Sequence, residues 1–160
     1  MTPELAVYAA QTRWLLQQFD QMLGELPVET LTATPPAALE GNCLLAIAKH
    51  AAAVTEVYAL GFGAGMPVER DRSREFIATA AELPGIRTRI QHLMASIDIA
   101  FGQAAAGRLD APFIPEPHLY GTGEPRQMTP REAIVENVRH LGIHLGEARL
   151  TRSLLTTPAP

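Results

Sequence analysis

Apolar residues recur at helical spacing in four long stretches of the chain, which predict four long helices. These stretches cover about residues 2–23, 42–61, 84–106 and 130–155. A shorter helix is expected near residues 76–81. No stretch alternates between apolar and polar positions in the way typical of a strand, and no internal repeat is evident. The pattern therefore predicts an all-α protein.

Long connections rich in proline and glycine separate the predicted helices, at about residues 27–41, 61–83 and 109–128. We expect a four-helix bundle with long interhelical connections, formed by a single domain over residues 1–155 and followed by a short tail, residues 156–160. Connections of this length are compatible with an up-down bundle and with a crossover bundle, so the topology stays open.

The composition is that of a globular protein, with 47% hydrophobic and 19% charged residues in a chain of 160. A chain of this length can bury a substantial core. The net charge of −4 gives no indication of a nucleic-acid partner. Cys43 is the only cysteine, which excludes an intramolecular disulfide. At the start of a helix, beside two leucines, this thiol is expected to be buried and inert rather than a nucleophile.

Nothing in the sequence predicts a membrane or secreted protein. The most apolar stretch, residues 42–66, contains Lys49, His50 and Glu56, and charges in the middle of a segment argue against a membrane span. The first ten residues include Glu4 and lack a basic start, so no signal peptide is expected. We expect a cytoplasmic protein.

Two histidines lie four residues apart in the last predicted helix. That helix begins at Thr129-Pro130-Arg131-Glu132, a capping-box spacing with proline at the first helical position. Four residues are just over one turn, so His140 and His144 project from one face, about 6 Å apart along the axis. Two imidazoles placed in this way can share one metal ion.

His50 is the candidate for a third ligand. It lies about 70° from the centre of the apolar stripe of the second predicted helix, and His140 and His144 occupy a similar position on the last one. Three imidazoles from two helices would leave a coordination position open, which is typical of a catalytic site. Histidine does not select one metal; we expect zinc or nickel, with iron or cobalt as alternatives. The competing interpretation is that each histidine is a partly buried, hydrogen-bonded side chain without a metal.

Polar residues near the two late histidines could support them. Glu136 and Asn137 each precede one histidine by about one turn or two, and either could orient a ring nitrogen. For Glu136, an ion pair with Arg139 or Arg131 is the favoured alternative. No catalytic residue is identified by pattern, and Glu136 and Glu147 are the only candidates.

Glu147 follows His144 by one turn. It could be a fourth ligand or a general base, while a surface ion pair with Arg149 or Arg152 is the favoured alternative. Glu56, in the second predicted helix, has the same ambiguity.

The string His-Leu-Gly-Ile-His-Leu-Gly-Glu, residues 140–147, resembles the late-helix motif His-x-x-x-His-x-Gly-Gln of the DinB/YfiT-like family. Residues 42–50, followed by Glu56, are similar to that family's Leu-Leu-x-x-x-x-His segment. The layout of helices and long loops agrees over about residues 1–155. Glu147 departs from the motif, because glutamine is usual at that position.

The resemblance implies a four-helix bundle that holds a divalent metal through His50, His140 and His144, commonly as a homodimer. Characterised relatives include thiol-dependent S-transferases and maleylpyruvate isomerases that use mycothiol, bacillithiol or glutathione. The implied function is a metal-dependent transferase or isomerase that acts on a small molecule with a low-molecular-weight thiol as cosubstrate. The alternative is a non-catalytic, metal-stabilised bundle that serves ligand binding or dimerisation.

The long loop before the last helix could fold over the metal cleft, since long loops in compact domains are often functional. Tyr120 and either Arg126 or Arg131 would then face an anionic substrate. His118 lies in the same loop, and His92 is expected to be exposed on the outer side of the third helix.

Overall fold

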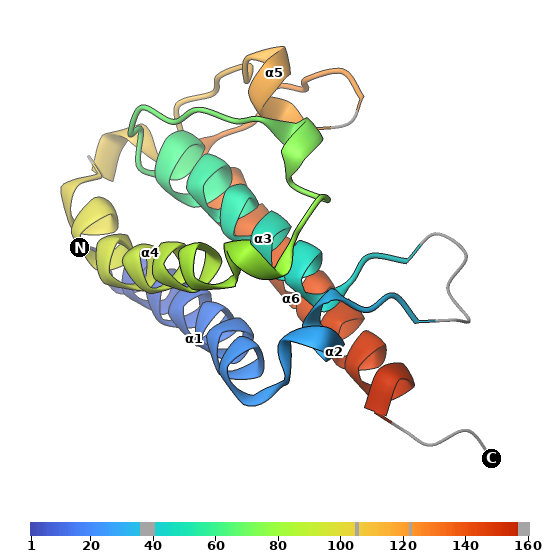
Figure 1. Ribbon diagram of the computed structural model, residues 1–160. Coiled ribbons are helices and arrows are strands. Elements are labelled where there is room, and N and C mark those ends of the chain that lie inside the picture. Colours follow the sequence, from blue (N-terminus) through green and yellow to red (C-terminus); the bar gives the residue numbers. More distant parts are fainter. Residues whose placement is uncertain (36–40, 105, 122, 157–160) are drawn as a thin grey trace.

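The computed structural model describes residues 1–35, 41–104, 106–121 and 123–156, and within these ranges all regular secondary structure is helical. The four predicted long helices are present (Figure 1). In the described part of the chain, six shorter helical segments lie between them. The long helices are α1 (Pro3–Glu25), α3 (Leu44–Thr55), α4 (Leu83–Gln103) and α6 (Pro130–Thr156). The shorter segments are α2 (Val28–Thr32), η1 (Glu56–Gly63), η2 (Arg72–Arg74), η3 (Ala80–Glu82), η4 (Ala106–Arg108) and α5 (Pro117–Tyr120).

The second predicted helix differs most from expectation. It begins at Leu44 after the N-cap Cys43, rather than at residue 42, and the half-buried thiol packs against the core. Beyond Thr55 the helix continues without a break into the π-helical segment η1, which ends at Gly63. The short helix expected at residues 76–81 is only the 3₁₀ turn η3, closed by a capping box between Thr79 and Glu82.

The start of α6 follows the predicted capping box. The backbone N–H of Glu132 donates to the Thr129 hydroxyl at 3.2 Å, and the backbone N–H of Thr129 donates to the Glu132 carboxylate at 2.6 Å. These bonds satisfy donors that the first helical turn leaves without partners. The helix then runs to Thr156, so the tail predicted from residue 156 falls almost wholly outside the described residues.

Helices α3 and α4 run parallel to each other. Lys49 pairs with Glu82 at 2.6 Å, and Glu56 pairs with Arg89, whose Nε lies 2.6 Å from the carboxylate. In both pairs the two partners are 33 positions apart in the sequence. The later residue of α3–η1 therefore pairs with the later residue of η3–α4, so the two helices run in the same direction. The connection between α3 and α4 must therefore travel back along the length of α3.

The other long helices pack in antiparallel and parallel pairs (Figure 1). Arg13 pairs with Asp98 and Asp20 with Arg87, so α1 and α4 are antiparallel. Residues early in α1 contact residues early in α6, which makes these two helices parallel and sets α6 antiparallel to α3. The helix directions are thus up, down, down and up, with a crossover between α3 and α4.

The core lies between the four long helices, and a smaller apolar cluster continues it at one end. In this second cluster, Leu119 of α5 and Met128 pack against Val57 and Phe62 of η1 and against Ala133 of α6. The cluster anchors the loop before α6 against the ends of α3 and α6.

The helical run Leu44–Gly63 is long and apolar enough to cross a bilayer. However, 83% of its most apolar window is buried inside the fold, and the core helix of a soluble protein has the same properties. This burial agrees with the expectation that the segment does not span a membrane.

Gly63→Ala is expected to destabilise the protein by about 1–3 kcal/mol, because η1 packs closely on α6 at this position. A Cβ on Gly63 would lie 2.6 Å from Cγ1 of Ile134 and 3.1 Å from the carbonyl oxygen of Tyr58. Gly142→Ala is the matched control. This glycine is in α6 with open space around its Cα, so alanine should stabilise by about 0.5–1 kcal/mol. Urea unfolding measures both effects, and equal stability of the two variants would contradict the close packing.

Candidate metal centre

Three histidines from α3 and α6 converge at one point. The Nε2 atom of His140 lies 3.1 Å from Nε2 of His50 and 3.0 Å from Nε2 of His144. The candidate ligand atoms of all three lie within 4.8 Å of one another. The antiparallel packing of α3 on α6, visible in Figure 1, brings together residues 90 positions apart.

The spacing of these nitrogens suits a single metal ion. Zinc–nitrogen bonds are about 2.0–2.1 Å long. Two nitrogens on one ion, at angles of roughly 90–110°, therefore lie about 2.9–3.4 Å apart. The separations of Nε2 in His140 from Nε2 in His50 and His144 both fall in this range.

Two carboxylates determine which ring nitrogens face the centre. Oε2 of Glu75 lies 2.7 Å from Nδ1 of His50, and Oε2 of Glu147 lies 2.6 Å from Nδ1 of His144. Since a carboxylate only accepts, each Nδ1 carries the proton and donates it to the bond. The Nε2 lone pairs of both rings therefore point inward.

Hydrogen bonds among the rings cannot satisfy this arrangement. His50 and His144 both present acceptors to Nε2 of His140, and a neutral imidazole carries a single N–H, so it can donate to one of them at most. A cation at the centre would accept all three lone pairs. The donor set thus fits a divalent metal better than it fits a network of rings alone.

Glu75 is itself held by an arginine. The side chains of Glu75 and Arg70 are 4% and 2% exposed, and Arg70 donates from Nε at 2.6 Å and from Nη2 at 3.0 Å. Burial acts to raise the pKa of Glu75, but hydrogen bonds from His50 and Arg70 outweigh it and lower this pKa to about 2. Glu75 is therefore a carboxylate at any pH at which the protein would bind a metal.

Burial keeps the late histidines neutral. It lowers the pKa of His140 to about 4, with further contributions from the neighbouring rings of His144 and His50. Burial also lowers the pKa of His144, against the opposing effect of Glu147. Neutral rings have the free lone pairs that metal ligands need.

A cavity of about 350 Å³ adjoins the histidine cluster. Tyr120 and Gly121, at the end of α5, form part of its wall, as the sequence analysis anticipated for this loop. Two bonds attach the loop to the cavity: Nη1 of Arg70 donates to the carbonyl of Leu119 at 2.8 Å, and the Tyr58 hydroxyl donates to the carbonyl of Tyr120 at 3.1 Å.

The basic residues expected to face a substrate are not among the residues that line this cavity. Arg131 pairs with Glu4 and Asp110, and exposed Arg126 is not among the cavity's lining residues. Exposed His118 has its Nδ1 3.5 Å from the Glu116 carboxylate.

In the described structure, the two polar residues before His140 make no hydrogen bond to its ring. Glu136 pairs with Arg139, its Oε2 accepting from Nε at 2.8 Å, which is the alternative favoured from sequence. Asn137 is fully buried and donates to the Thr12 hydroxyl at 3.3 Å instead of orienting a histidine. Its side-chain oxygen has no hydrogen-bond partner in the described part of the chain.

Glu147 is placed neither as a fourth ligand nor in the surface ion pair with Arg149 or Arg152 that was favoured from sequence. Its carboxylate bonds to Nδ1 of His144, on the side of the ring that faces away from the cluster. Glu147 therefore orients a ligand and is not itself placed as a fourth ligand. The expected surface partners bind elsewhere: Arg149 donates to Gln18, and Arg152 lies 3.5 Å from Glu25.

The residues that the α3–α4 connection brings to His50 were not predicted from the sequence. Besides Arg70 and Glu75, Phe76 stacks on the His50 ring with centroids 4.5 Å apart and an interplanar angle of 28°. The mixed run of charges over residues 69–75 was the one visible signal. Nothing local in that run distinguishes Glu75 from its neighbours.

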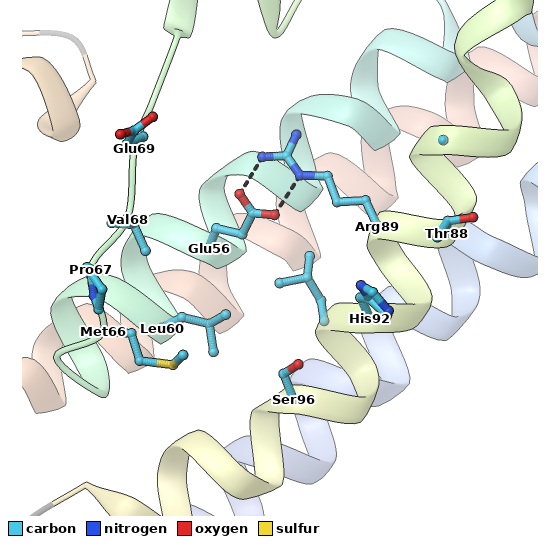
Figure 2. Close-up of a pocket in the computed structure, with 12 residues that line it drawn as sticks. Glu56, Leu60, Met66, Pro67, Val68, Glu69, Thr88, Arg89, His92 and Ser96 are labelled. Carbon is cyan, nitrogen blue, oxygen red and sulfur yellow. Dashed lines mark hydrogen bonds and ion pairs between the residues drawn. The ribbon is translucent and has the colours of Figure 1, made fainter.

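A larger cavity, of about 610 Å³, lies between η1 and α4 and does not include the cluster (Figure 2). Glu56 points to Arg89 across its wall, which identifies Glu56 as an ion-pair residue. Exposed His92 also lines it. The smaller cavity is the better candidate for chemistry, because three inward-facing nitrogen donors meet there.

Glu147→Ala is expected to weaken metal binding by about tenfold, because the His144 ring would lose the acceptor that sets its tautomer. Glu116→Ala is the control, since Glu116 is exposed, lies beside His118 outside the cluster and does not line the cavity. Titration with zinc in a competing chelator measures both affinities. Equal affinities in the two variants would show that Glu147 does not support the site.

Acid is expected to destabilise the metal-free protein over two pH ranges. The pKa of His140 falls from 6.5 to about 4 in the folded state, so stability present above pH 6.5 is lost as the pH falls toward 4. The pKa of Glu75 falls from 4.5 to about 2, so the stability it contributes above pH 4.5 is lost as the pH falls toward 2. Urea unfolding in the presence of a chelator measures this dependence. Constant stability between pH 6.5 and pH 4.5 would contradict the shift at His140.

A comparison with protein-family models places these features in a family. The model described as the DinB superfamily matches residues 11–148, a range that contains α3, most of α6 and all three clustered histidines. No match was found among curated proteins or among solved structures. Because the family model matches well over half of the sequence, the chain belongs to the DinB superfamily.

Proposed function

We propose that this protein is a four-helix-bundle metalloenzyme whose His50, His140 and His144 hold one divalent metal, zinc or nickel first. The reaction is the transfer or isomerisation of a small molecule with a low-molecular-weight thiol as cosubstrate. The observation that carries the proposal is the meeting of three Nε2 atoms, two of them turned inward by carboxylates on Nδ1.

The protein's own residues position and enclose such a reaction. Glu75 and Glu147 orient two of the rings, and Arg70 connects Glu75 to the backbone of α5. The bond from Tyr58 to Tyr120 holds the end of α5 at the cavity wall. When bound, a divalent cation would lower the pKa of a thiol and hold this nucleophile beside an electrophilic carbon.

Three protein ligands leave room for a cosubstrate. A closed structural site has four protein ligands, whereas catalytic zinc sites have three and an open position. Within the described residues, no fourth donor joins the three histidines in a ligand cluster. The cavity beside the cluster supplies the space that a small substrate needs.

Elemental analysis after reconstitution with zinc or nickel tests the metal part of the proposal, with about one equivalent bound as the expected result. A screen of glutathione, mycothiol and bacillithiol with model electrophiles then tests turnover. A protein that takes up no metal would refute the proposal. A protein that takes up metal but turns over none of these thiols would favour the alternative, a metal-stabilised bundle for ligand binding or dimerisation.

We also propose that the protein is a homodimer, as the family resemblance implies, and that it is cytoplasmic, as its sequence pattern indicates. Light scattering coupled to size-exclusion chromatography measures the mass in solution, and a single 17.3 kDa species would contradict the dimer.

A further inference from the structure

We propose that Arg72 forms a carboxylate-binding subsite beside the histidine cluster, so that the small-molecule ligand of this cavity is a carboxylate. The inference rests on the proposed function, because it places the ligand's reacting atom at the three histidines. It adds the charge of the ligand and the residue that recognises it.

Arg72 lies on the wall of the cavity, and the ring of Phe76 separates it from the candidate ligand His50. Its Cζ atom is 5.6 Å from the centroid of Phe76, and Phe76 stacks on the His50 ring. The guanidinium therefore stands on an aromatic face, an arrangement that limits its freedom while leaving its donors available. Half-burial reduces the screening of its charge by water.

The other two arginines of the cavity are already engaged. Arg70 donates to Glu75 and to the carbonyl of Leu119, and Arg139 pairs with Glu136. For the Arg72 guanidinium, no carboxylate or carbonyl partner occurs within residues 1–35, 41–104, 106–121 and 123–156.

The backbone of Gly121 lies beside Arg72 on the cavity wall, and the space for a ligand group is the cavity itself. Nη1 of Arg72 lies 3.4 Å from the position that a Cβ on Gly121 would occupy. Gly121 has a φ of 112°, which favours glycine, so the backbone approaches the guanidinium here without a side chain between them. A planar carboxylate fits the two parallel donors of arginine.

The charges of the cavity agree with an anionic ligand. Its described lining carries three arginines, Arg70, Arg72 and Arg139, and one carboxylate, Glu136, while Glu75 and Glu147 lie directly behind His50 and His144, so these groups balance before any metal is added. A divalent cation on the three histidines would therefore give the site a net positive charge. A ligand with a carboxylate at Arg72 and its reacting group toward His140 would compensate this charge at both ends.

Two thiols that differ in one group test the inference: 3-mercaptopropionate, which carries a carboxylate, and 3-mercaptopropanol, which does not. Calorimetric titration of the zinc-loaded wild type should show about tenfold tighter binding of the carboxylate thiol. Arg72→Gln should remove this preference without changing zinc content, and Arg72→Lys should restore part of it. Arg74→Gln is the matched control, since Arg74 is 81% exposed and does not line this cavity.

The possible results separate the inference from the proposed function. If the wild type binds both thiols equally, or if Arg72→Gln keeps the preference, the carboxylate subsite is refuted while the thiol proposal stands. If neither thiol binds, succinate is titrated in their place. Binding of succinate that weakens about tenfold in Arg72→Gln would support the subsite and refute the thiol cosubstrate, and absence of succinate binding would refute both.

Discussion

His140→Ala is expected to lower the affinity for zinc by roughly 100-fold or more. His140 is the central ligand of the candidate site, with its Nε2 about equally distant from Nε2 of His50 and of His144. Four-ligand zinc sites bind with about 10–16 kcal/mol, so one ligand accounts for roughly 3 kcal/mol, which corresponds to two orders of magnitude in affinity. His50→Ala and His144→Ala should have effects of similar size, because each removes one of the three inward-facing nitrogens.

Competition with a chromophoric chelator measures these affinities, and elemental analysis after dialysis measures retention. His92→Ala and His118→Ala are matched controls: both histidines are exposed and lie outside the cluster, so their loss should leave metal content unchanged. Circular dichroism confirms that each variant is helical. Full metal retention by all three cluster variants would show that the metal, if bound, lies elsewhere.

Glu75→Ala is expected to destabilise the protein by about 3–5 kcal/mol and to weaken zinc binding by about 10–100-fold. The loss of stability follows because Arg70, 2% exposed, would remain as a buried charge without its carboxylate. The loss of affinity follows because Nδ1 of His50 would lose the acceptor that fixes its tautomer. Urea unfolding and zinc titration measure the two effects separately.

Two further variants distinguish these effects. Glu75→Gln keeps an acceptor for His50 but removes the negative charge beside Arg70, so the destabilisation should persist while part of the zinc affinity returns. Glu69→Ala is the matched control, because Glu69 belongs to the same connection but is exposed. If Glu75→Ala were as stable as Glu69→Ala, the buried pair would not have the structural role assigned to it.

The long helices were predictable because their signals are local. Apolar residues at helical spacing identified all four, and the Thr129–Glu132 capping box identified the start of α6 within one residue. The spacing of His140 and His144 placed both on one face, which depends only on the geometry of a single helix. Where local signals compete, the prediction was less accurate: the helix predicted to end at residue 61 continues as π-helix to Gly63.

The residues that contact the His50 ring were not predictable, because their positions depend on how the helices are arranged. Glu75 and Phe76 reach His50 because α3 and α4 are parallel, which forces the connection to pass back along α3. Connections of this length are compatible with either topology, so the sequence left the crossover undecided. The same reasoning applies to Arg72, which faces the cavity only because this connection passes there.

The sequence by itself determined the helices, their apolar faces and the three candidate ligands, because helical periodicity and side-chain chemistry are properties of short segments. Only the tertiary structure decided that the three Nε2 atoms meet, which carboxylates hold two of the rings, and which arginine remains available to a ligand. The physical reason is that these contacts join residues up to 90 positions apart, and the packing of whole helices, rather than any local pattern, brings such residues together.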